Sequence, residues 1–373
     1  MKHGIEVLVA SLAIVGIANA QVKSYSIAGN VTGPGGQPVS NATVSERWEC
    51  ENGHLSPDSK AFTTDANGRF SGSVSSVRFP VALMAVDISG EMGDAILLGS
   101  NPDEEQHLSL KLEPLANVSM NVGVKQLPGF EETVGMEIFL TDASAPSTDL
   151  RKLPMCFLLT FGNAKAPLRL PPGHFRLLVR TRTISYFDHR FEVPQASSVD
   201  LGHLEADASE EGLIFGHELP EWHLAAARGL PDSVKLKDFR GKYLLVESWA
   251  YWCVPCCQEG IPQLMRFWDE HKNQQSRFAM VALHTYNGTE GGHVTSMADV
   301  DRLTERSKAK YWGGRAIPVP VLLDDSDKTA KEWGIGAIPN VMLIDPNGVL
   351  VRTDDPYAYL AKKLAESAPT KTK

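Results

Sequence analysis

The chain has 373 residues, a length at which more than one hydrophobic core is expected. Hydrophobic residues make up 43% of it and charged residues 22%, which is the composition of an ordinary globular protein. The formal net charge of −9, without a dense run of Lys and Arg, argues against nucleic acid as a partner, because phosphate binding needs basic patches.

The first 20 residues have the pattern of a secretory signal peptide. Lys2 gives a short positive start, residues 5–17 are mostly apolar, and Ala18-Asn19-Ala20 fits an A-x-A cleavage site. A membrane anchor is the alternative, but the apolar run is shorter than the ~20 residues that a spanning helix needs. We therefore expect cleavage after Ala20 and a mature protein that is secreted or periplasmic, where disulfides persist.

Residues 21–113 are predicted to form a β-sandwich. Short apolar and polar alternations are separated by turn residues, and in FTTDANGRFSGSV the pair Asn67-Gly68 stands between two strand-like runs, which predicts a hairpin. The order G-x-V, G-x-P-V-x-x-A-x-V, T-D-x-x-G-x-F resembles the carboxypeptidase regulatory-like β-sandwich. That resemblance implies a stalk or adhesion module without chemistry of its own, which contacts a cell surface or the envelope.

Residues 114–206 are predicted to form a second β-sandwich-like module, because APLRLPPGHFRLLVRT joins a Pro-Pro-Gly turn to an alternating strand. Cys156 lies in the apolar run LPMCFLLTF and is expected to be a buried core thiol. Cys50 is expected to be a free thiol that is at the surface or half-buried. A disulfide between Cys50 and Cys156 is an alternative that the sequence leaves open, since it depends on geometry.

After the polar segment ASEEG, residues 207–373 are predicted to form an α/β domain. The strand-like runs GKYLLVESWAYW, RFAMVALHTY and VPVLLDD alternate with the helical runs CCQEGIPQLMRFWDEHK, ADVDRLTERSKAKYW and KTAKEWGI. NVMLIDPNGVLVRTD is predicted to be a hairpin, and PYAYLAKKLAES a final helix. This order predicts a central mixed sheet with helices on both faces. The chain is therefore expected to be multidomain, with two all-β modules before an α/β domain.

Three of the five cysteines stand together in SWAYWCVPCCQEG. Cys253 and Cys256 form a C-x-x-C motif where a buried strand meets a helix. Only the thiolate is nucleophilic, and a helix N-terminus lowers the pKa of a cysteine, so Cys253 is expected to be the attacking thiol. Cys256, three residues further on, faces the same side of the helix and can close a disulfide.

Two further residues are candidates for the same site. Glu247 precedes the motif by six residues on the buried strand. A carboxyl group there is expected to be desolvated, to have a raised pKa, and to accept a proton from Cys256 during exchange. In a redox fold of this type, Pro339 would be a cis proline beside the C-x-x-C, and the backbone before it would pair with a substrate chain.

The segments LPEWHL, LKDFRGK and WAYWCVPC follow one another in this order. Residues from about 212 to 368 thereby resemble the TlpA/ResA-like thiol-disulfide oxidoreductases of the thioredoxin superfamily. The resemblance implies a thioredoxin fold in which the nucleophile, the resolving thiol, the cis-proline and the buried acid are Cys253, Cys256, Pro339 and Glu247. It implies an enzyme that reduces disulfides of partner proteins and receives electrons from a membrane thiol carrier. Neither a cofactor nor a bound metal is expected.

Cys257 departs from that family pattern. Cys253 and Cys257 have the C-x-x-x-C spacing of copper-binding Sco-type proteins, which add a distant histidine, and His284 is the nearest candidate. A Cu(I) chaperone using Cys253 and Cys257 is therefore one alternative function, and a cell-surface interaction protein with a vestigial redox domain is another. Pro339 favours exchange over copper, because a proline there suits peptide docking, and the intact C-x-x-C speaks against a vestigial domain.

Overall fold

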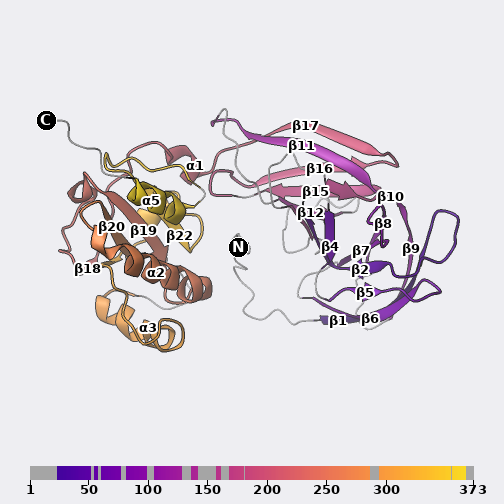
Figure 1. The fold of residues 1–373 in the computed structure, drawn as a ribbon, viewed down its shortest axis with the longest axis horizontal. Coiled ribbons are helices and arrows are strands. Elements are labelled where there is room, and N and C mark those ends of the chain that lie inside the picture. Colours follow the sequence, from indigo (N-terminus) through magenta and orange to yellow (C-terminus); the bar gives the residue numbers. More distant parts are fainter. Residues whose placement is uncertain are drawn as a thin grey trace. The chain divides into compact units, whose positions relative to one another are not determined.

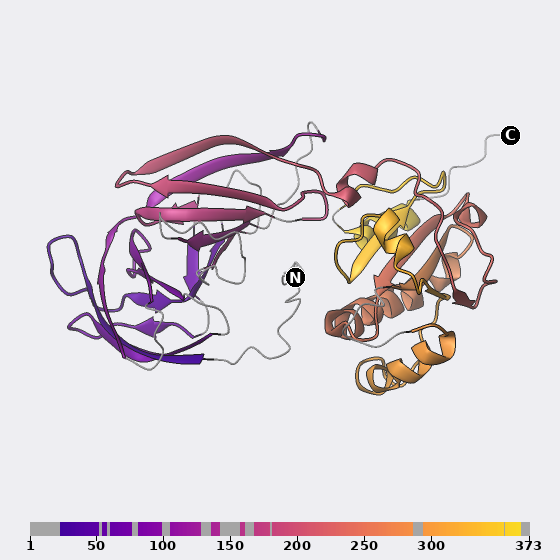
Figure 2. The same cartoon turned by 180° about the vertical axis from the view of Figure 1, so that it is seen from behind.

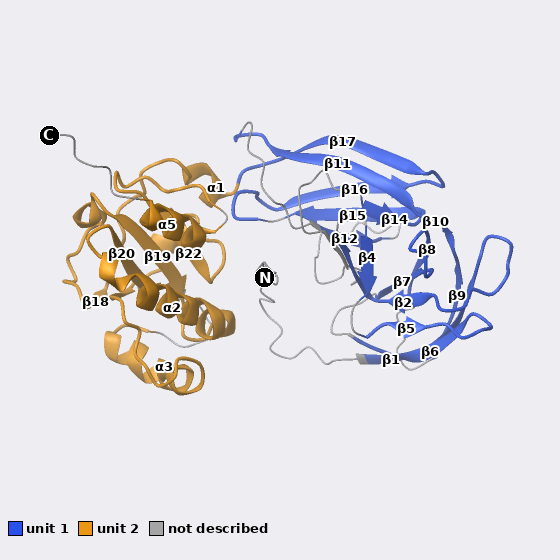
Figure 3. Cartoon of the chain, viewed as in Figure 1, with its two compact units in different colours: residues 1–208 blue, residues 209–373 orange. Residues whose placement is uncertain are grey.

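A computed structural model of the protein describes residues 23–51, 54–57, 60–76, 81–98, 105–127, 136–141, 157–160, 168–179, 181–285, 294–353 and 355–366 (Figure 1). The expected signal peptide and Cys156 lie outside these residues. The chain divides into two compact units, Met1–Ala208 and Ser209–Lys373, which Figure 3 shows in different colours. No helix among the described residues has the length and apolarity that crossing a bilayer requires.

Unit 1, residues 1–208, is rich in β-strands, as the alternating sequence pattern predicts. Its described strands are β1 (Lys23–Thr32), β2 (Thr43–Ser45), β3 (Arg47–Glu51), β4 (His54–Pro57), β5 (Phe62–Thr63), β6 (Arg69–Ser76), β7 (Ala82–Val86), β8 (Met92–Leu97), β9 (Gln106–Lys111), β10 (Glu113–Pro114), β11 (Ala116–Val124), β12 (Met136–Leu140), β13 (Phe157–Thr160), β14 (Leu168–Leu170), β15 (Gly173–Val179), β16 (Phe187–Val193) and β17 (Ser198–Ala206). Their sheet orders are β6-β1-β9, β10-β8-β7-β2-β5, β14-β11-β17 and β16-β15-β12-β13-β3-β4.

Strand β7 lies between two hydrophobic clusters of unit 1. Leu83 and Ala85 belong to a cluster shared with β1, β6 and β9, whereas Met84 belongs to a second cluster shared with β3, β11, β12 and β15. All of its side chains are buried, because neighbouring residues of a strand point to opposite faces of the sheet. One strand therefore contributes to both hydrophobic cores.

Strands from both expected β modules share one sheet. β3 and β4, from residues 21–113, continue the sheet formed by β12, β13, β15 and β16, through parallel pairing of β3 with β13. The indole N–H of Trp48 on β3 donates to the carbonyl oxygen of Met84 at 3.2 Å. The β-rich content of residues 21–206 agrees with the sequence pattern, while its division into two sandwich-like modules near residue 113 stays a prediction.

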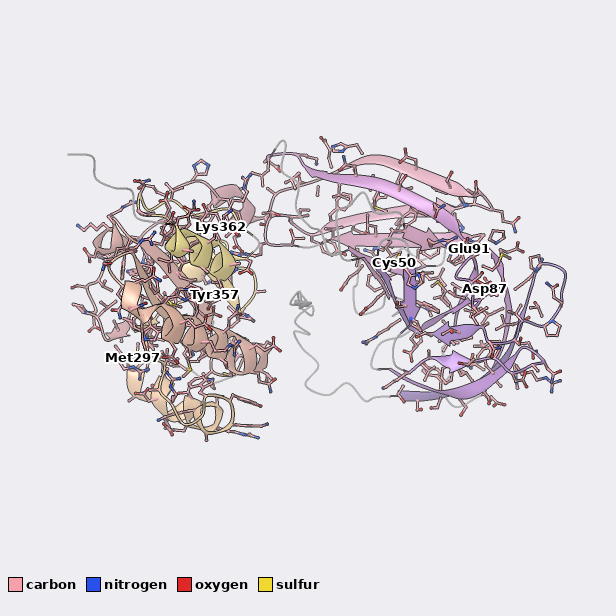
Figure 4. All side chains as sticks on the ribbon, in the orientation of Figure 1. Cys50, Asp87, Glu91, Met297, Tyr357 and Lys362 are labelled. Carbon is pink, nitrogen blue, oxygen red and sulfur yellow. A yellow bond between two sulfur atoms is a disulfide. The ribbon has the colours of Figure 1, made fainter. Side chains whose placement is uncertain are left out.

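Two local expectations for unit 1 are wrong. The turn at Gly68 is present, with φ +71° and its N–H bonded to the Asp65 carbonyl, but the flanking strands β5 and β6 pair with β2 and β1 in different sheets. The hairpin is therefore not formed. Cys50, labelled in Figure 4, lies on β3 within the second cluster and is only 2% exposed, so it is a core thiol and not a surface one.

Unit 2, residues 209–373, has the mixed α/β order that its sequence predicts. Its described elements are α1 (Glu210–Ile214), β18 (Ala226–Arg228), η2 (Leu236–Phe239), β19 (Tyr243–Trp249), η3 (Cys256–Gly260), α2 (Ile261–His271), η4 (Lys272–Gln274), β20 (Phe278–His284), α3 (Met297–Tyr311), β21 (Val321–Leu323), α4 (Lys328–Glu332), β22 (Asn340–Ile344) and α5 (Pro356–Ala365). The sheet order is β18-β21-β20-β19-β22, with β19, β20 and β21 parallel and the two edge strands antiparallel.

Both faces of this sheet are covered. Leu245 of β19 packs in a cluster with α2, α3 and α5, whereas its neighbours Leu244 and Val246 pack in another cluster with Trp222 and Trp333. Figure 1 shows α2 and α5 alongside the central strands, and Figure 2 shows the same unit from behind. β19 is an interior strand with side chains buried on both faces, and the three clustered cysteines follow its carboxyl end.

Candidate active site

Cys253 and Cys256 are joined by a disulfide, with their Cα atoms 5.2 Å apart. Cys253 follows the turn that leaves β19, and helical structure begins at Val254. The Cys256 N–H points at the Cys253 Sγ at 3.2 Å. Cys253 is 5% exposed and Cys256 is fully buried, while Val254 beside them is 58% exposed. Of the two cysteines, Cys253 is therefore the one that keeps some exposure, although both are largely buried.

The helix that carries the second and third cysteines starts with a π turn, η3, in which the Ile261 N–H donates to the Cys256 carbonyl. Pro262 explains this turn. It has no N–H for the carbonyl four residues earlier, and its ring crowds that carbonyl in a regular α-helix, so an i-to-i+5 turn relieves the conflict. Cys256 and Cys257 are consecutive, and consecutive helical residues point ~100° apart.

The segment before β22 lies against this helix. The Ile338–Pro339 peptide bond is cis, and the Ile338 carbonyl oxygen is 3.7 Å from the Cys253 Sγ. A Cβ placed on Gly260 would be 3.4 Å from the Cβ of Pro339. The structure therefore brings Pro339 to the C-x-x-C from 83 residues further along the chain (339 − 256 = 83). Its role in binding a substrate chain stays a prediction.

Glu247 is fully buried on β19. The Tyr357 hydroxyl on α5, labelled in Figure 4, donates to its Oε2 at 2.8 Å, and its Oε1 has no hydrogen-bond partner among the described residues. Burial raises the pKa of Glu247 to about 8, although the hydrogen bond from Tyr357 opposes the shift. The carboxyl group is therefore mostly protonated at neutral pH.

Gly260 is a site residue that the sequence analysis missed. A Cβ on Gly260 would lie 2.6 Å from the Glu247 Oε1, so any larger residue would collide with the buried carboxyl group. Gly260 stands one turn beyond Cys256, which places Glu247 beside the cysteine-bearing turn. The available signal was a glycine inside a helical pattern, which is unfavourable unless close packing requires it. Tyr357 was missed as well, because nothing in the sequence connects it with Glu247.

Cys257 and His284 both lie behind the motif. Cys257 is a buried thiol whose Sγ donates to the Tyr251 carbonyl oxygen at 3.3 Å. Burial raises its pKa, against a hydrogen bond from Ser307 that lowers it. His284 is fully buried, and burial lowers its pKa to about 4.

The copper alternative depends on these two residues. Within the described residues, no group of three or more His, Cys, Asp and Glu side chains is placed to hold a metal ion. Cys253 pairs with Cys256, not with Cys257. His284 accepts a hydrogen bond from the Tyr251 N–H through its Nε2.

The fold and this cysteine pair agree with a family match. Residues 215–363 match the family model described as Redoxin. Over this segment the chain resembles the TlpA/ResA-like members of the thioredoxin superfamily. The match lies within unit 2, and the resemblance of residues 21–113 to a carboxypeptidase regulatory-like β-sandwich stays a prediction.

Two curated relatives resemble parts of the chain. It is 31% identical over 96 residues to the thioredoxin-like protein YneN of Bacillus subtilis, a match that covers 26% of this chain and 53% of YneN. It is 30% identical over 67 residues to the thiol-disulfide oxidoreductase ResA of Bacillus cereus, covering 18% of this chain and 37% of ResA. The chain thus spans about half, or less, of the length of these relatives.

Solved structures of similar domains also match. The thioredoxin domain of a thiol-disulfide oxidoreductase from Bacteroides vulgatus is 25% identical, with 39% of this chain and 99% of that chain covered and a TM-score of 0.27. StoA from Bacillus subtilis is 22% identical, with 34% and 84% covered and a TM-score of 0.24.

Proposed function

We propose that the protein is a thiol-disulfide oxidoreductase that exchanges a dithiol for a disulfide with partner proteins through Cys253 and Cys256. The observation that carries this proposal is the Cys253–Cys256 disulfide at the start of a helix, in which Cys253 is 5% exposed and Cys256 is fully buried. The Redoxin match over residues 215–363 and the similarity to ResA support the same chemistry.

In the reduced protein, the Cys253 thiolate attacks one sulfur of a partner disulfide. The partner's S–S bond breaks, its second sulfur leaves as a thiolate, and a mixed disulfide joins the two proteins. Cys256 then attacks the Cys253 sulfur, which closes the internal disulfide and releases the partner's first thiol. Two electrons pass from the cysteine pair to the partner. The Cys256 N–H, 3.2 Å from the Cys253 Sγ, stabilises the thiolate.

In this proposal the ionised form of Glu247, which is the minor form at neutral pH, is the proton acceptor for Cys256. Cys256 must lose its proton before it can attack, and a base is most effective when its pKa lies near the working pH. The pKa of Glu247, raised to about 8 by burial, meets that condition. Its unpaired Oε1 lies against Gly260, one turn beyond Cys256. Within the same proposal, the backbone before Pro339 pairs with the substrate chain.

The setting of the reaction belongs to the proposal as well. We infer that the protein is secreted or periplasmic after cleavage behind Ala20, because residues 1–20 have the pattern of a signal peptide. It acts as a reductase, with electrons from a membrane thiol carrier, as the TlpA/ResA-like resemblance implies. The β-rich unit contacts a cell surface or the envelope.

Trapping a mixed disulfide tests the two cysteine roles. With insulin as the disulfide substrate and dithiothreitol as the reductant, Cys253→Ser should abolish turnover, because the attacking sulfur is gone. Cys256→Ser, reduced and then freed of dithiothreitol before insulin is added, should accumulate a covalent adduct with insulin, because the resolving thiol is absent. Mass spectrometry of unreduced samples identifies the adduct.

Cys50→Ala is the matched control, because it removes a thiol from the other unit and should leave turnover unchanged. A Cys256→Ser protein that turns over as fast as the parent and traps no adduct would contradict the proposed roles.

A further inference from the structure

The turn between β19 and the cysteine helix consists of residues 250–252. The Cys253 N–H donates to the Ala250 carbonyl at 3.1 Å, so the turn ends at Cys253, which carries the attacking sulfur. Both backbone polar groups of Tyr251, in the middle of the turn, bind side chains. Its N–H donates to the His284 Nε2 at 3.3 Å, and its carbonyl accepts from the Cys257 Sγ at 3.3 Å.

His284 is held in place by contacts other than its hydrogen bond to the Tyr251 N–H. It lies at the end of β20, where the Asp324 N–H donates to its carbonyl at 3.0 Å. Its ring meets Trp249 edge-on, with centroids 5.2 Å apart, and lies nearly parallel to the Tyr251 ring at 6.0 Å. Strand pairing and two aromatic rings therefore leave the imidazole little freedom.

Packing alone does not explain a histidine at position 284. The ring is neutral at physiological pH, since burial lowers its pKa to about 4. Because the Nε2 accepts the Tyr251 N–H, the ring proton is on Nδ1, and that atom has no hydrogen-bond partner among the described residues. An unpaired buried donor is destabilising, and an apolar side chain would avoid it. An apolar side chain, however, could not accept the hydrogen bond from the Tyr251 N–H that the Nε2 accepts.

Cys257 is fixed from the opposite side. Trp312, which follows α3, donates its indole N–H to the Cys257 carbonyl at 2.8 Å. Cys256 and Cys257 diverge around the helix, so the first closes the disulfide while the second turns its sulfur to Tyr251. Its raised pKa keeps it a neutral thiol, which donates a hydrogen bond and is a poor nucleophile.

We propose that His284 and Cys257 are positioning residues that hold the Tyr251 backbone from its two ends and thereby fix Cys253 at the helix N-terminus. Among the described residues, neither side chain is hydrogen-bonded to the Cys253 sulfur, whose polar contacts are with the Ile338 carbonyl and the Cys256 N–H. His284 and Cys257 act through the turn, which leads to Cys253 after two residues. This inference rests on the proposed thiol-disulfide exchange, and it assigns to the third cysteine of the cluster a hydrogen-bonding role without redox chemistry.

The test uses the full mature chain with conservative and disruptive variants at each position. Cys257→Ser keeps a donor for the Tyr251 carbonyl, whereas Cys257→Ala removes it. His284→Gln keeps an acceptor, whereas His284→Leu removes it. Two quantities are measured for each variant: the rate constant for reaction of the reduced protein with oxidised glutathione, and the pKa of Cys253, from the pH dependence of its alkylation by iodoacetamide located by mass spectrometry.

Cys257→Ala and His284→Leu should each slow exchange about three- to tenfold, the effect of losing one hydrogen bond, and raise the pKa of Cys253. Cys257→Ser should restore most of the rate. The double variant should be slower by less than the product of the two single effects, since both residues act on one turn. If His284→Leu does not fold, the two Cys257 variants still test the positioning role, because they leave β20 unchanged.

Several results would overturn the inference. A Cys257→Ala protein with the parent's rate and Cys253 pKa would show that the thiol positions nothing. Equal losses in Cys257→Ser and Cys257→Ala would assign redox or metal chemistry to the sulfur. Alkylation needs no exchange partner, so a parent protein that does not react with glutathione contradicts the proposed function, while an unchanged Cys253 pKa contradicts the positioning role.

Discussion

Glu247 is the residue whose chemistry departs most from that of an exposed carboxyl group. Burial raises its pKa from 4.5 to about 8 in the folded protein. Below pH 4.5 the group is protonated in both the folded and the unfolded states. Between pH 4.5 and 8 the unfolded chain releases the proton and the folded chain retains it, so the free energy of unfolding falls as pH rises, by at most ~1.4 kcal/mol per pH unit.

Replacing Glu247 by Gln should remove this dependence, because an amide has no proton to lose in that range. Urea unfolding of unit 2, followed by tryptophan fluorescence at pH 5, 6, 7 and 8, measures it. Relative to Glu247→Gln, the parent should lose stability as the pH rises over this range, and Glu247→Gln should be the more stable of the two at pH 8. The lowered pKa of His284 has the opposite effect up to about pH 6.5, but it is common to both proteins. Equal slopes in both proteins would show that Glu247 ionises as freely in the folded state as in the unfolded one.

The sequence predicts those parts of the site that depend on residues close together in the chain. The spacing of Cys253 and Cys256, next to an apolar run, predicts a redox pair because helix geometry brings residues three apart together. Gly260 and Tyr357 escaped prediction because their importance comes from contact with Glu247 across the fold. The contact of His284 with Tyr251 is of the same kind.

At the scale of the element, the π turn η3 sets where each cysteine points and how close the helix approaches β19. Ala is a better helix former than Gly by about 1 kcal/mol, which by itself predicts that Gly260→Ala stabilises the protein. The added Cβ would meet the Glu247 Oε1 at 2.6 Å, and Tyr357 holds that carboxyl group in place. We therefore expect the steric clash of the added Cβ to outweigh the gain in helix propensity, so that Gly260→Ala destabilises the protein.

Gly260→Ala should lower the free energy of unfolding of unit 2 by about 1–3 kcal/mol, the usual range for an overpacked core. Urea unfolding measures it. Glu259→Ala, at the neighbouring exposed position, should change stability by less than about 0.5 kcal/mol and serves as the control. In a Glu247→Ala background the loss should shrink, since the colliding oxygen is absent. A Gly260→Ala protein as stable as the parent would contradict the close approach.

Elements were easier to predict than their partners. The turn at Asn67-Gly68 and the α/β alternation of unit 2 follow from turn chemistry and periodicity, both of which are local. The pairing of β5 with β2, and of β6 with β1, depends on contacts between distant segments. A turn pair such as Asn67-Gly68 predicts that the chain reverses direction, but it does not predict which strands pair.

On the scale of the whole molecule, the same limit applies to the division into domains. β3 pairs in parallel with β13, about 110 residues later, and β7 has side chains in two cores. An alternating pattern states which face of a strand is buried, and it carries no information about which sheet the strand joins. The boundary between β-rich and α/β regions was readable from sequence because the hydrophobic period itself changes there.

A redox titration of the purified chain from Gln21 onward, with thiol-tag mass spectrometry reading which cysteines pair, tests the central claim most directly. The account predicts that Cys253 and Cys256 titrate together, with a potential near that of thioredoxin, roughly −270 mV, as expected of a reductase. A potential nearer −120 mV would reverse the proposed direction of electron flow. A Cys253–Cys256 pair that does not titrate, or a disulfide formed between Cys253 and Cys257, would contradict the account itself.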